Sequence, residues 1–388
     1  MADETAIDWT RPTSHRWKFD FELVPPNRLG DSYGYLDNVD PSSVTITEGY
    51  YTDTRVQAKL TYYGENPHRQ AYIRIIATDT MSGYSEALGT FIPTSDDVTM
   101  EGSIVKTTLN LESILYGISM QKLQREWVCA TGTYAYTNLV NILVKKCGMS
   151  LDGSNFRFAV DKHGRDVEPN DVEFNQTALK DAGSSILELM YGICNATNNR
   201  LDVDGRGRVL WYKYIAPSER VPTFTITLNS SDSIVLDGVT RSSNYLEMAS
   251  QITVHATKTG TGDAEDEEKT QTVTATGRFG LDQRGYIVGK YYDVSELDPF
   301  TDQKAQALAQ EHLKASQNEN MEWQLTMEYM PIYTGDVGYL EGLQDAYSGY
   351  SGRQKVFVKS REIDLATMTQ KLTLKAASSN DTDTGDEE

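Results

Sequence analysis

The sequence contains few residues that could bind a metal ion or carry out redox chemistry. Three cysteines occur among 388 residues, and their positions show none of the paired spacings of a zinc site or a redox motif: Cys129, Cys147 and Cys194. The five histidines lack the helical spacing of a zinc protease: His15, His68, His163, His255 and His312. We therefore expect reduced thiols, no metal ion and no other cofactor.

Positive charge is also scarce. The chain has 36 lysines and arginines against 56 aspartates and glutamates, which gives a net charge of -20. A surface that binds nucleic acid needs clustered cations that contact phosphate groups, so sequence-specific nucleic-acid binding is not expected. Two interpretations of the acidic charge stay open. It suits the wall of a channel through which DNA moves, or it serves only to keep the protein soluble.

Long apolar runs are missing as well. No stretch approaches 18 consecutive apolar residues, and Met1–Thr5 is neither basic nor apolar. The sequence therefore predicts neither a membrane span nor a secretory signal, and we expect synthesis in a cytoplasm. Hydrophobic residues make up 39% of the chain, which is enough for packed cores in two or three domains.

The motifs of several enzyme classes do not occur. There is no Gly-x-Ser-x-Gly and no Walker loop, and Gly205-Arg206-Gly207 lacks the third glycine of a dinucleotide site. Asp202–Gly205 begins like a calcium loop, but Arg206 and Lys213 stand where oxygen ligands are required. A pair of catalytic carboxylates, as in a glycan hydrolase, stays open because such acids converge only in the folded protein. We predict that the protein is not an enzyme.

Alternating apolar residues indicate a β-rich first region. Trp17–Leu23 alternates strictly and ends before Pro25, because proline cannot continue a central strand. Further strands are predicted at Ser43–Thr47, Val56–Tyr62 and Tyr72–Thr78. An alternating segment at Ile104–Leu115 then predicts one more strand and a short helical turn.

Helical spacing appears in the middle of the chain. One helix is predicted from Leu139 to Cys147, ending at Gly148, and a second from Ile186 to Cys194, with Asp181 as its capping candidate. Asp204-Gly205 is the favoured dipeptide for a two-residue hairpin turn between two short strands. The middle region is therefore predicted to be mixed α/β.

Strands resume in the third region, at Phe224–Leu228, Ser233–Leu236 and Ser250–Ala256. The charged, glycine-containing stretch Lys258–Lys269 predicts a mobile loop between two strands. Ser378–Glu388 has no large apolar residue, so a disordered acidic tail is predicted there.

The closing segment combines one amphipathic helix with short strands. Ala305, Leu308 and Leu313 recur at helical spacing after Thr301, and the period changes to two at Trp323–Met327. A last hairpin runs from Val356 to Leu374 with its turn at Ala366-Thr367 and a bulge between Ser360 and Ile363, and it directs Leu372 and Leu374 inward. The segment predicts a helix that lies on a small antiparallel barrel.

This closing segment resembles the tail hub proteins of long-tailed bacteriophages, which form the baseplate hub and the amino-terminal module of tail-associated proteins. The resemblance rests on a helix, a proline-containing strand end, a Gly-Asp pair and a final hairpin, and on two segments near the start: Ala305–Ala315, Tyr329–Pro331, Gly335-Asp336, Val356–Val358 with Leu372–Leu374, and Tyr72–Ile76 with Glu86–Pro93.

The resemblance implies a mainly β fold with α/β portions, in which two tail-tube-like antiparallel β-barrel domains flank an α/β domain. We place the domains at residues 1–127, 128–217 and 218–377, followed by the tail 378–388. It also implies a homotrimer whose six barrels match a six-fold tube. Its partners would be the distal tail protein hexamer, the tape measure protein and receptor-binding or fibre proteins. A secretion-spike hub and a tail-borne glycan or peptidoglycan hydrolase are the alternatives.

Tyrosine is abundant, with 23 in the chain. Paired tyrosines suit surfaces that are buried against a partner but still need a polar tip, although tyrosine is also common on ordinary strands. The candidate partner-interface residues are Tyr33, Tyr35, Tyr50, Tyr51, Tyr62, Tyr63, Tyr291, Tyr292, Tyr347 and Tyr350.

Overall fold

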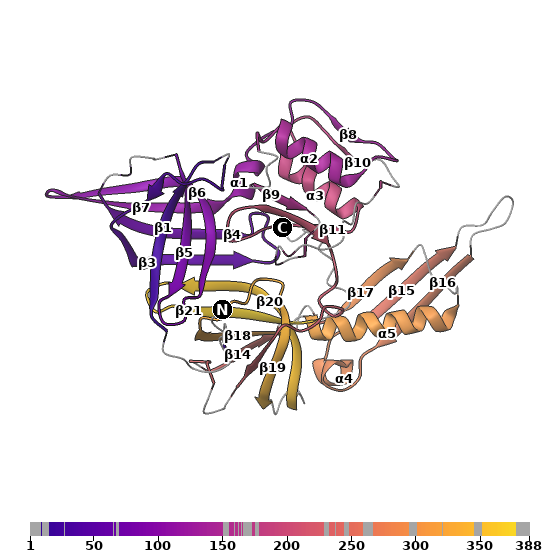
Figure 1. The fold of residues 1–388 in the computed structure, drawn as a ribbon. Coiled ribbons are helices and arrows are strands. Elements are labelled where there is room, and N and C mark those ends of the chain that lie inside the picture. The colour runs from indigo at the N-terminus through magenta and orange to yellow at the C-terminus, as the bar shows by residue number, and fades with distance from the viewer. Residues whose placement is uncertain are drawn as a thin grey trace, which may run out of the picture.

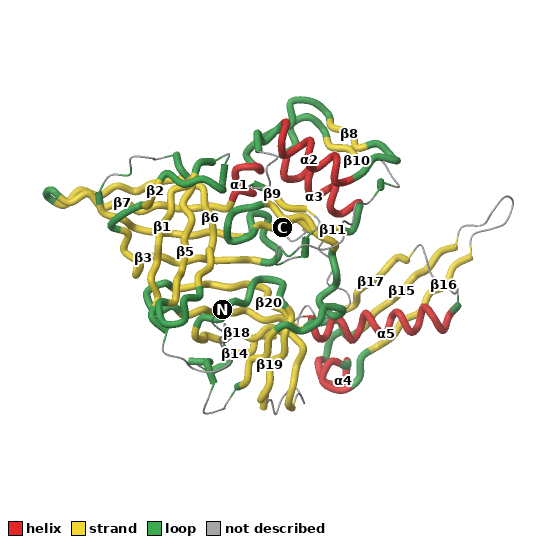
Figure 2. The backbone as a smooth tube through the Cα atoms, in the orientation of Figure 1, coloured by secondary structure: helices red, strands yellow, loops and turns green. Residues whose placement is uncertain are grey.

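The structure is a computed structural model, and it describes most of the chain (Figures 1 and 2). The described residues are 9, 15–26, 28–64, 66, 70–149, 155–158, 160–161, 163, 165, 173–174, 178–228, 233–236, 238–243, 248–258, 267–294, 301–319, 321–344 and 351–377. The predicted acidic tail 378–388 lies outside these ranges.

The first part of the chain forms one antiparallel set of strands. They are β1 (Trp17–Val24), β2 (Gly34–Tyr35), β3 (Val39–Gly49), β4 (Val56–Tyr63), β5 (Tyr72–Asp79), β6 (Ser85–Glu101) and β7 (Ile104–Ser113). Their order in the sheet is β2-β1-β5-β6-β7-β4-β3. Alternate residues of each strand enter a common core, as period two requires, and Leu23, Leu60 and Ile73 are fully buried in it. The short helix α1 (Ile114–Ser119) follows β7 directly.

The last part of the chain forms a second set. Its strands are β13 (Phe224–Thr227), β14 (Thr240–Ser243), β18 (Met321–Glu328), β19 (Val337–Gln344), β20 (Ser351–Asp364) and β21 (Thr369–Ala376). The predicted final hairpin is β20–β21, and its bulge lies between Val358 and Ser360, slightly earlier than predicted. Leu372 and Leu374 point into the core as predicted. The predicted strand at Ser233–Leu236 is reduced to one bridge, between Val235 and Met327.

The two sets contain the same four-stranded unit. The strands β4, β5, β6 and β7 lie in the order β5-β6-β7-β4, and β18, β19, β20 and β21 lie in the order β19-β20-β21-β18, with every pair antiparallel. In both units the strand that comes third along the chain is the longest, with 17 residues in β6 and 14 in β20. The chain therefore carries an internal repeat at the level of topology.

The two sets join into one 13-stranded sheet, because β3 pairs with the far half of β20, where Ile46 lies opposite Ile363. A mainly β fold with α/β portions is confirmed. The prediction of two closed barrels is not: within the described residues, no ladder closes either set on itself. In the second set, the edge of β20 beyond Val358 pairs with β3 of the first set rather than with a strand of its own. In the first set, the corresponding edge of β6 beyond Phe91 pairs with no described strand.

The middle region packs two helices against short strands. Its elements are β8 (Trp127–Cys129), α2 (Ala135–Lys145), β9 (Phe156–Phe158), β10 (Ala178–Lys180), α3 (Ile186–Ala196), β11 (Asn199–Val203) and β12 (Val209–Lys213). The apolar faces of both helices are buried in a core that they share with α1 and with Val24 of β1, and Leu139, Leu143 and Ile193 are fully buried there. The cap of α3 is Ser185, whose hydroxyl accepts a hydrogen bond from the Glu188 N–H, and not Asp181 as predicted.

The hairpin turn after β11 is longer than predicted. The Asp204 N–H donates to the Arg208 carbonyl and the Gly207 N–H donates to the Asp204 carbonyl, so three residues form the loop rather than two. Gly207 takes the left-handed conformation that such a loop requires, with φ +79°. The Asp204 carboxylate accepts from both the backbone N–H and the guanidinium of Arg208, which closes the loop.

A third, smaller unit is inserted before β18. It contains β15 (Gln251–Lys258), β16 (Glu267–Thr274), the 3-10 turn η1 (Gly277–Phe279), α4 (Leu281–Arg284), β17 (Gly289–Val294) and α5 (Asp302–Glu319). The predicted helix is α5, but it lies along the β16-β15-β17 sheet and not on a barrel (Figure 1). Ala305 and Ala309 are buried in one core with Ile252 and Val254 of β15. Of the predicted loop, residues 259–266 lie outside the described part of the chain.

Candidate functional site: the strand junction and the exposed surfaces

A buried ion pair spans the ladder between the two sets. Arg361 of β20 donates from its Nε to the Glu48 carboxylate of β3 at 3.2 Å, a second nitrogen completes the pair, and Nη1 donates to the Ile332 carbonyl at 2.6 Å. Both side chains are buried. A buried ion pair is stable only when its remaining donors are satisfied, and this guanidinium meets that condition through the carbonyl. The two sets are thus joined by a charge pair as well as by the ladder.

A second polar cluster lies beside this pair. The hydroxyls of Tyr84 and Tyr333 both donate to Oε2 of Glu86, at 2.5 and 2.8 Å. Burial raises the pKa of the Glu86 carboxyl above its usual range, and the two hydroxyl donors and Arg361 offset part of that rise. Tyr333 belongs to the segment that precedes β19, so this cluster also connects the first and last parts of the chain.

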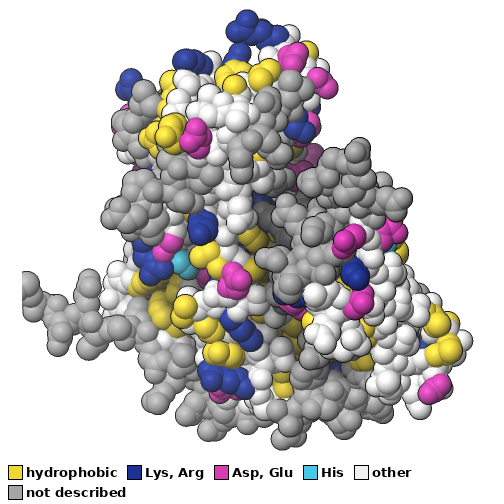
Figure 3. Space-filling view, turned by 90° about the vertical axis from the view of Figure 1, so that its right-hand side faces the viewer, with side chains coloured by type: hydrophobic (Ala, Val, Ile, Leu, Met, Phe, Trp, Pro, Cys, Tyr) yellow, Lys and Arg dark blue, Asp and Glu magenta, His cyan; other side chains and the backbone are white. Residues whose placement is uncertain are grey.

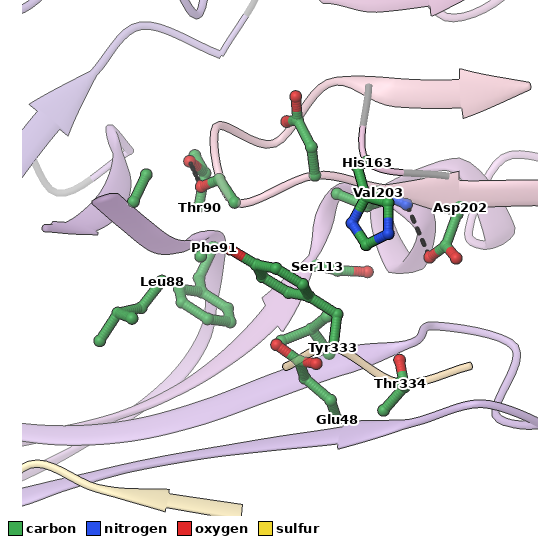
Figure 4. A pocket seen from close by; sticks show the side chains of 15 residues that line it. Glu48, Leu88, Thr90, Phe91, Ser113, His163, Asp202, Val203, Tyr333 and Thr334 are labelled. Carbon is green, nitrogen blue, oxygen red and sulfur yellow. Dashed lines mark hydrogen bonds between the residues drawn. The ribbon is translucent and has the colours of Figure 1, made fainter. Parts of the chain in front are cut away.

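A cavity of about 190 Å³ opens where three parts of the chain meet (Figure 4). Phe91 and Thr90 of β6, Asp202 and the hairpin after β11, and Tyr333 line it. The hairpin fits tightly against β6, since a Cβ added to Gly205 would lie 1.8 Å from the Ala87 carbonyl oxygen. The carboxylates of Glu48, Asp202 and Asp204 that line it each accept a hydrogen bond from this chain, so the cavity is part of a packed seam.

Tyr50 is the point where arginines from different parts of the chain converge. The guanidinium of Arg200 lies 3.6 Å from the centre of the Tyr50 ring and donates to the Tyr50 carbonyl at 2.5 Å. Arg220 donates to the Tyr50 hydroxyl at 2.9 Å, and Arg55 donates to the same carbonyl as Arg200. Because Tyr50 is fully buried inside one chain, its prediction as a partner-interface residue is corrected to a packing role.

The other predicted tyrosines fall into four groups. Tyr62 is buried in the first core and is corrected in the same way. Tyr51 and Tyr292 are half-buried: Tyr51 meets the edge of Tyr50, and Tyr292 stacks on His312 with ring centres 4.1 Å apart. The exposed ones are Tyr33 and Tyr35 beside β1, Tyr63 at the end of β4 and Tyr291 on β17. Tyr347 and Tyr350 lie outside the described residues.

The far ends of β6 and β7 form an arm that was not predicted from the sequence. Beyond Phe91, β6 has a ladder with β7 and, within the described residues, with no other strand. Figure 1 shows this hairpin extending past the rest of the sheet on the left. Val98 is 50% exposed and Met100 is 74% exposed on it. The alternation of Val98 and Met100 could have predicted a strand here, but the two apolar residues stand among polar ones and the pattern is short.

The view in Figure 3 shows a different surface. On this face, which lies to the right in Figure 1, exposed apolar side chains lie in small groups among charges of both signs. Such scattered apolar residues are normal for a protein surface and do not indicate a partner. The arm is therefore the more distinctive exposed feature.

The cysteines are buried or half-buried, and His163 contacts an aspartate. Cys129 and Cys194 are buried, and burial raises the pKa of Cys147 to about 12, which makes its thiol a poor nucleophile at neutral pH. His163 lies 3.2 Å from an Asp336 oxygen. Among the described residues, no three His, Cys, Asp or Glu side chains are placed to hold a metal ion. In the same ranges, no helix has both the length and the apolar character that crossing a bilayer would need.

No family model and no curated protein matches this sequence. Solved structures do match its fold. The 43 kDa tail protein of prophage MuSo2 from Shewanella oneidensis has a TM-score of 0.57 at 11% identity, over 93% of this chain and 99% of that one. The tail protein from Neisseria meningitidis MC58 has a TM-score of 0.55 at 11% identity, over 92% and 96%. A chain of the Francisella PdpA–VgrG complex has 0.51 at 11% identity, over 95% of this chain and 59% of its own length.

The chain therefore has the fold of phage tail proteins, and the agreement covers more than nine-tenths of the chain. At the level of fold, this confirms the resemblance to phage tail hub proteins.

Proposed function

We propose that this protein is a structural component of a phage virion, a homotrimeric hub at the tip of a long tail. The observation that supports this most strongly is the repeated four-stranded unit within a phage tail fold. Two equivalent units in each of three subunits make six, which lets a trimer stack on a six-fold ring. In this role the protein caps and extends the tail tube and forms part of the channel through which DNA leaves.

The proposed partners follow from that position. The distal tail protein hexamer and the tape measure protein would contact the ring, and receptor-binding or fibre proteins would lie below it. The proposed domains are residues 1–127, 128–217 and 218–377, with the unit of β15–β17 and α5 inserted in the last. We place the protein at the tail tip, after synthesis in the bacterial cytoplasm. The exposed tyrosines Tyr33, Tyr35, Tyr63 and Tyr291 remain candidate contact residues.

No catalytic role is proposed. The carboxylates that line the junction cavity hold the chain together through Arg361, Arg208 and the Tyr212 hydroxyl. The purified chain should therefore release no reducing sugar and no muropeptide from cell-wall preparations. Turnover that one Asp or Glu substitution abolishes would instead support the tail-borne hydrolase.

A secretion-spike hub is the second candidate. This candidate is supported by the match to a chain of the PdpA–VgrG complex, whose TM-score is nearly the same as those of the tail proteins. The particle that contains the protein distinguishes the two, because a phage hub is recovered with DNA-filled heads and a spike hub is not.

Light scattering on the purified chain tests the proposed oligomer. A mass of three chains is expected. A monomer at high concentration, or a hexamer, would contradict the trimeric hub.

A further inference from the structure

The repeat between the two strand sets extends to the residue register. β6 and β20 each have a bulge, between Pro93 and Ser95 and between Val358 and Ser360. The residues that follow each bulge face equivalent partners: Ser95 lies opposite Asn110 and Asp96 opposite Leu109, while Ser360 lies opposite Thr373 and Arg361 opposite Leu372. Ser95–Thr99 of β6 therefore corresponds to Ser360–Asp364 of β20.

The same register relates β3 to β14. Each of these strands lies on the outer side of the fourth strand of its unit, β3 on β4 and β14 on β18. In the first set, Asn110 of β7 lies opposite Lys59 of β4, which lies opposite Thr45 of β3. In the second set, Thr373 of β21 lies opposite Gln324 of β18, which lies opposite Thr240 of β14. Asn110 and Thr373, Lys59 and Gln324, and Thr45 and Thr240 are therefore counterparts. Thr45–Glu48 of β3 therefore corresponds to Thr240–Ser243 of β14.

One of the two equivalent edges is covered and the other is open. The far half of β20 pairs with β3, and Ile363 and Ile46 are fully buried there. The far half of β6 has no such neighbour in the described part of the chain, and Val98, the counterpart of Ile363, is 50% exposed. β14, the counterpart of β3, has a ladder to β18 and to no other described strand.

We propose that the far half of β6 pairs with β14 of a second copy of this chain, in the register that β20 and β3 use within one chain. This inference rests on the proposed trimer and assigns its interface. Transferring the register of the β20–β3 ladder gives four antiparallel pairs: Asp96 with Ser243, Asp97 with Ser242, Val98 with Arg241, and Thr99 with Thr240. The unpaired edge of an exposed strand is the kind of surface that another strand completes.

The charges of the two edges are complementary. The far half of β6 carries Asp96, Asp97 and Glu101 and no cation, whereas β14 carries Arg241 and no acid. Asp96 and Val98 lie on the same face of β6, so Arg241 opposite Val98 comes within reach of the Asp96 carboxylate on the diagonal. Within one chain Arg361 and Glu48 lie directly opposite each other, whereas the proposed Asp96–Arg241 pair lies on the diagonal of the equivalent ladder.

This interface is heterologous, because each copy offers one β6 arm and one β14 edge. Such a contact closes into a ring when its rotation divides a full turn. If the contact between copies reproduces the contact within a copy, six units alternate around the ring and three chains close it. The exposed apolar side chains of the arm, Val98 and Met100, are then buried against the next copy.

Disulfide cross-linking tests the register. We would combine Asp97→Cys with Ser242→Cys, since directly opposed residues of antiparallel strands have Cα atoms about 4.5–5.5 Å apart, within disulfide range. Mild oxidation should convert the double variant into covalent dimers and trimers, with nothing larger, on a non-reducing gel. A mixture of the two single variants should stop at dimers. Glu362→Cys with Thr47→Cys, opposed within one chain, is the positive control and should form a disulfide at monomer size.

The out-of-register control is Asp97→Cys with Thr240→Cys, which should cross-link at least tenfold more slowly. One outcome is a trimer by light scattering while the in-register pair fails to cross-link, or cross-links no faster than this control. That result would overturn the proposed ladder but would not contradict the trimeric hub. Covalent chains longer than three would support the ladder and contradict the closed trimer. A monomer at every concentration, without cross-links, rejects both.

Discussion

The backbone of Gly335 lies against the ring of Tyr50. A Cβ added to Gly335 would lie 2.4 Å from the Cε2 of that ring, and Gly335 has a left-handed backbone with φ +78°. Gly335 also presents its carbonyl to Arg220, which donates to it at 2.6 Å. The turn before β19 is thereby held against the loop between β3 and β4, so that the first and last parts of the chain meet at a glycine.

Gly335→Ala should be clearly destabilising, and Gly83→Ala is its matched control. Gly83 has the same φ, but a Cβ added there would have no neighbouring atom within 4 Å. The left-handed backbone alone should cost about 1–2 kcal/mol of unfolding free energy at Gly83. At Gly335 the displaced ring should add about 1–3 kcal/mol. Chemical denaturation of both variants measures the difference, and equal losses would show that the ring gives way freely.

Removing one partner of the Glu48–Arg361 pair should be severe. Glu48→Gln or Arg361→Met alone leaves a buried group without its charge partner, and each should cost about 3–5 kcal/mol of unfolding free energy. The double variant should lose less than the sum, because neither charge is then left unpaired. A double-mutant cycle by chemical denaturation measures the coupling, and strictly additive losses would refute a direct pair.

The two faces of β21 should respond differently to the same charge. Leu372 is fully buried in the second core, so Leu372→Asp should cost several kcal/mol and abolish assembly. Thr373 is half-buried and faces outward, so Thr373→Asp should cost under about 1 kcal/mol. Thermal unfolding of the two variants compares them. Similar melting temperatures would show that β21 is not an inner strand.

Acid should weaken the fold through Asp79. Burial alone would raise the pKa of this carboxyl, but hydrogen bonds from the Ser82 hydroxyl, His15 and the backbone N–H groups of Arg16 and Met81 outweigh it and hold the pKa well below the usual range. A lowered carboxyl pKa contributes stability above the unfolded-state pKa of about 3.9, and that contribution is lost as the pH falls below it.

Melting temperatures between pH 7 and pH 3 measure this effect against Asp79→Asn. The wild-type chain should lose more stability across this range than the variant, because the variant has no carboxylate to protonate at this position. An equal loss in both would assign the acid sensitivity to other groups.

Much of the fold could be predicted from local patterns. The strands β1, β5 and β21 and the helices α2 and α3 have clear periods of two or 3.6, since each has one buried face. The far half of β6 could not be predicted, because Thr94–Glu101 is mostly polar and is exposed within one chain. α5 was predicted correctly as a helix, but the sheet against which it packs could not be predicted from its small buried residues.

The site was harder to predict than the elements. Tyr50 and Tyr51 have the same residue type and adjacent positions, yet Tyr50 is fully buried because arginines from distant segments surround it. The Glu48–Arg361 pair joins residues more than 300 positions apart, and no local pattern relates them. Both depend on which strands become neighbours, which is decided by packing between the two sets.

In the proposed function, three copies of this chain form a ring at the tip of a tail. Electron cryomicroscopy of the particle that contains the protein tests it most directly. We expect three copies at the tip, in a ring with six-fold pseudosymmetry in which β20–β3 contacts within a chain alternate with β6–β14 contacts between chains. Six copies in the ring, or a position away from the tip, would contradict it.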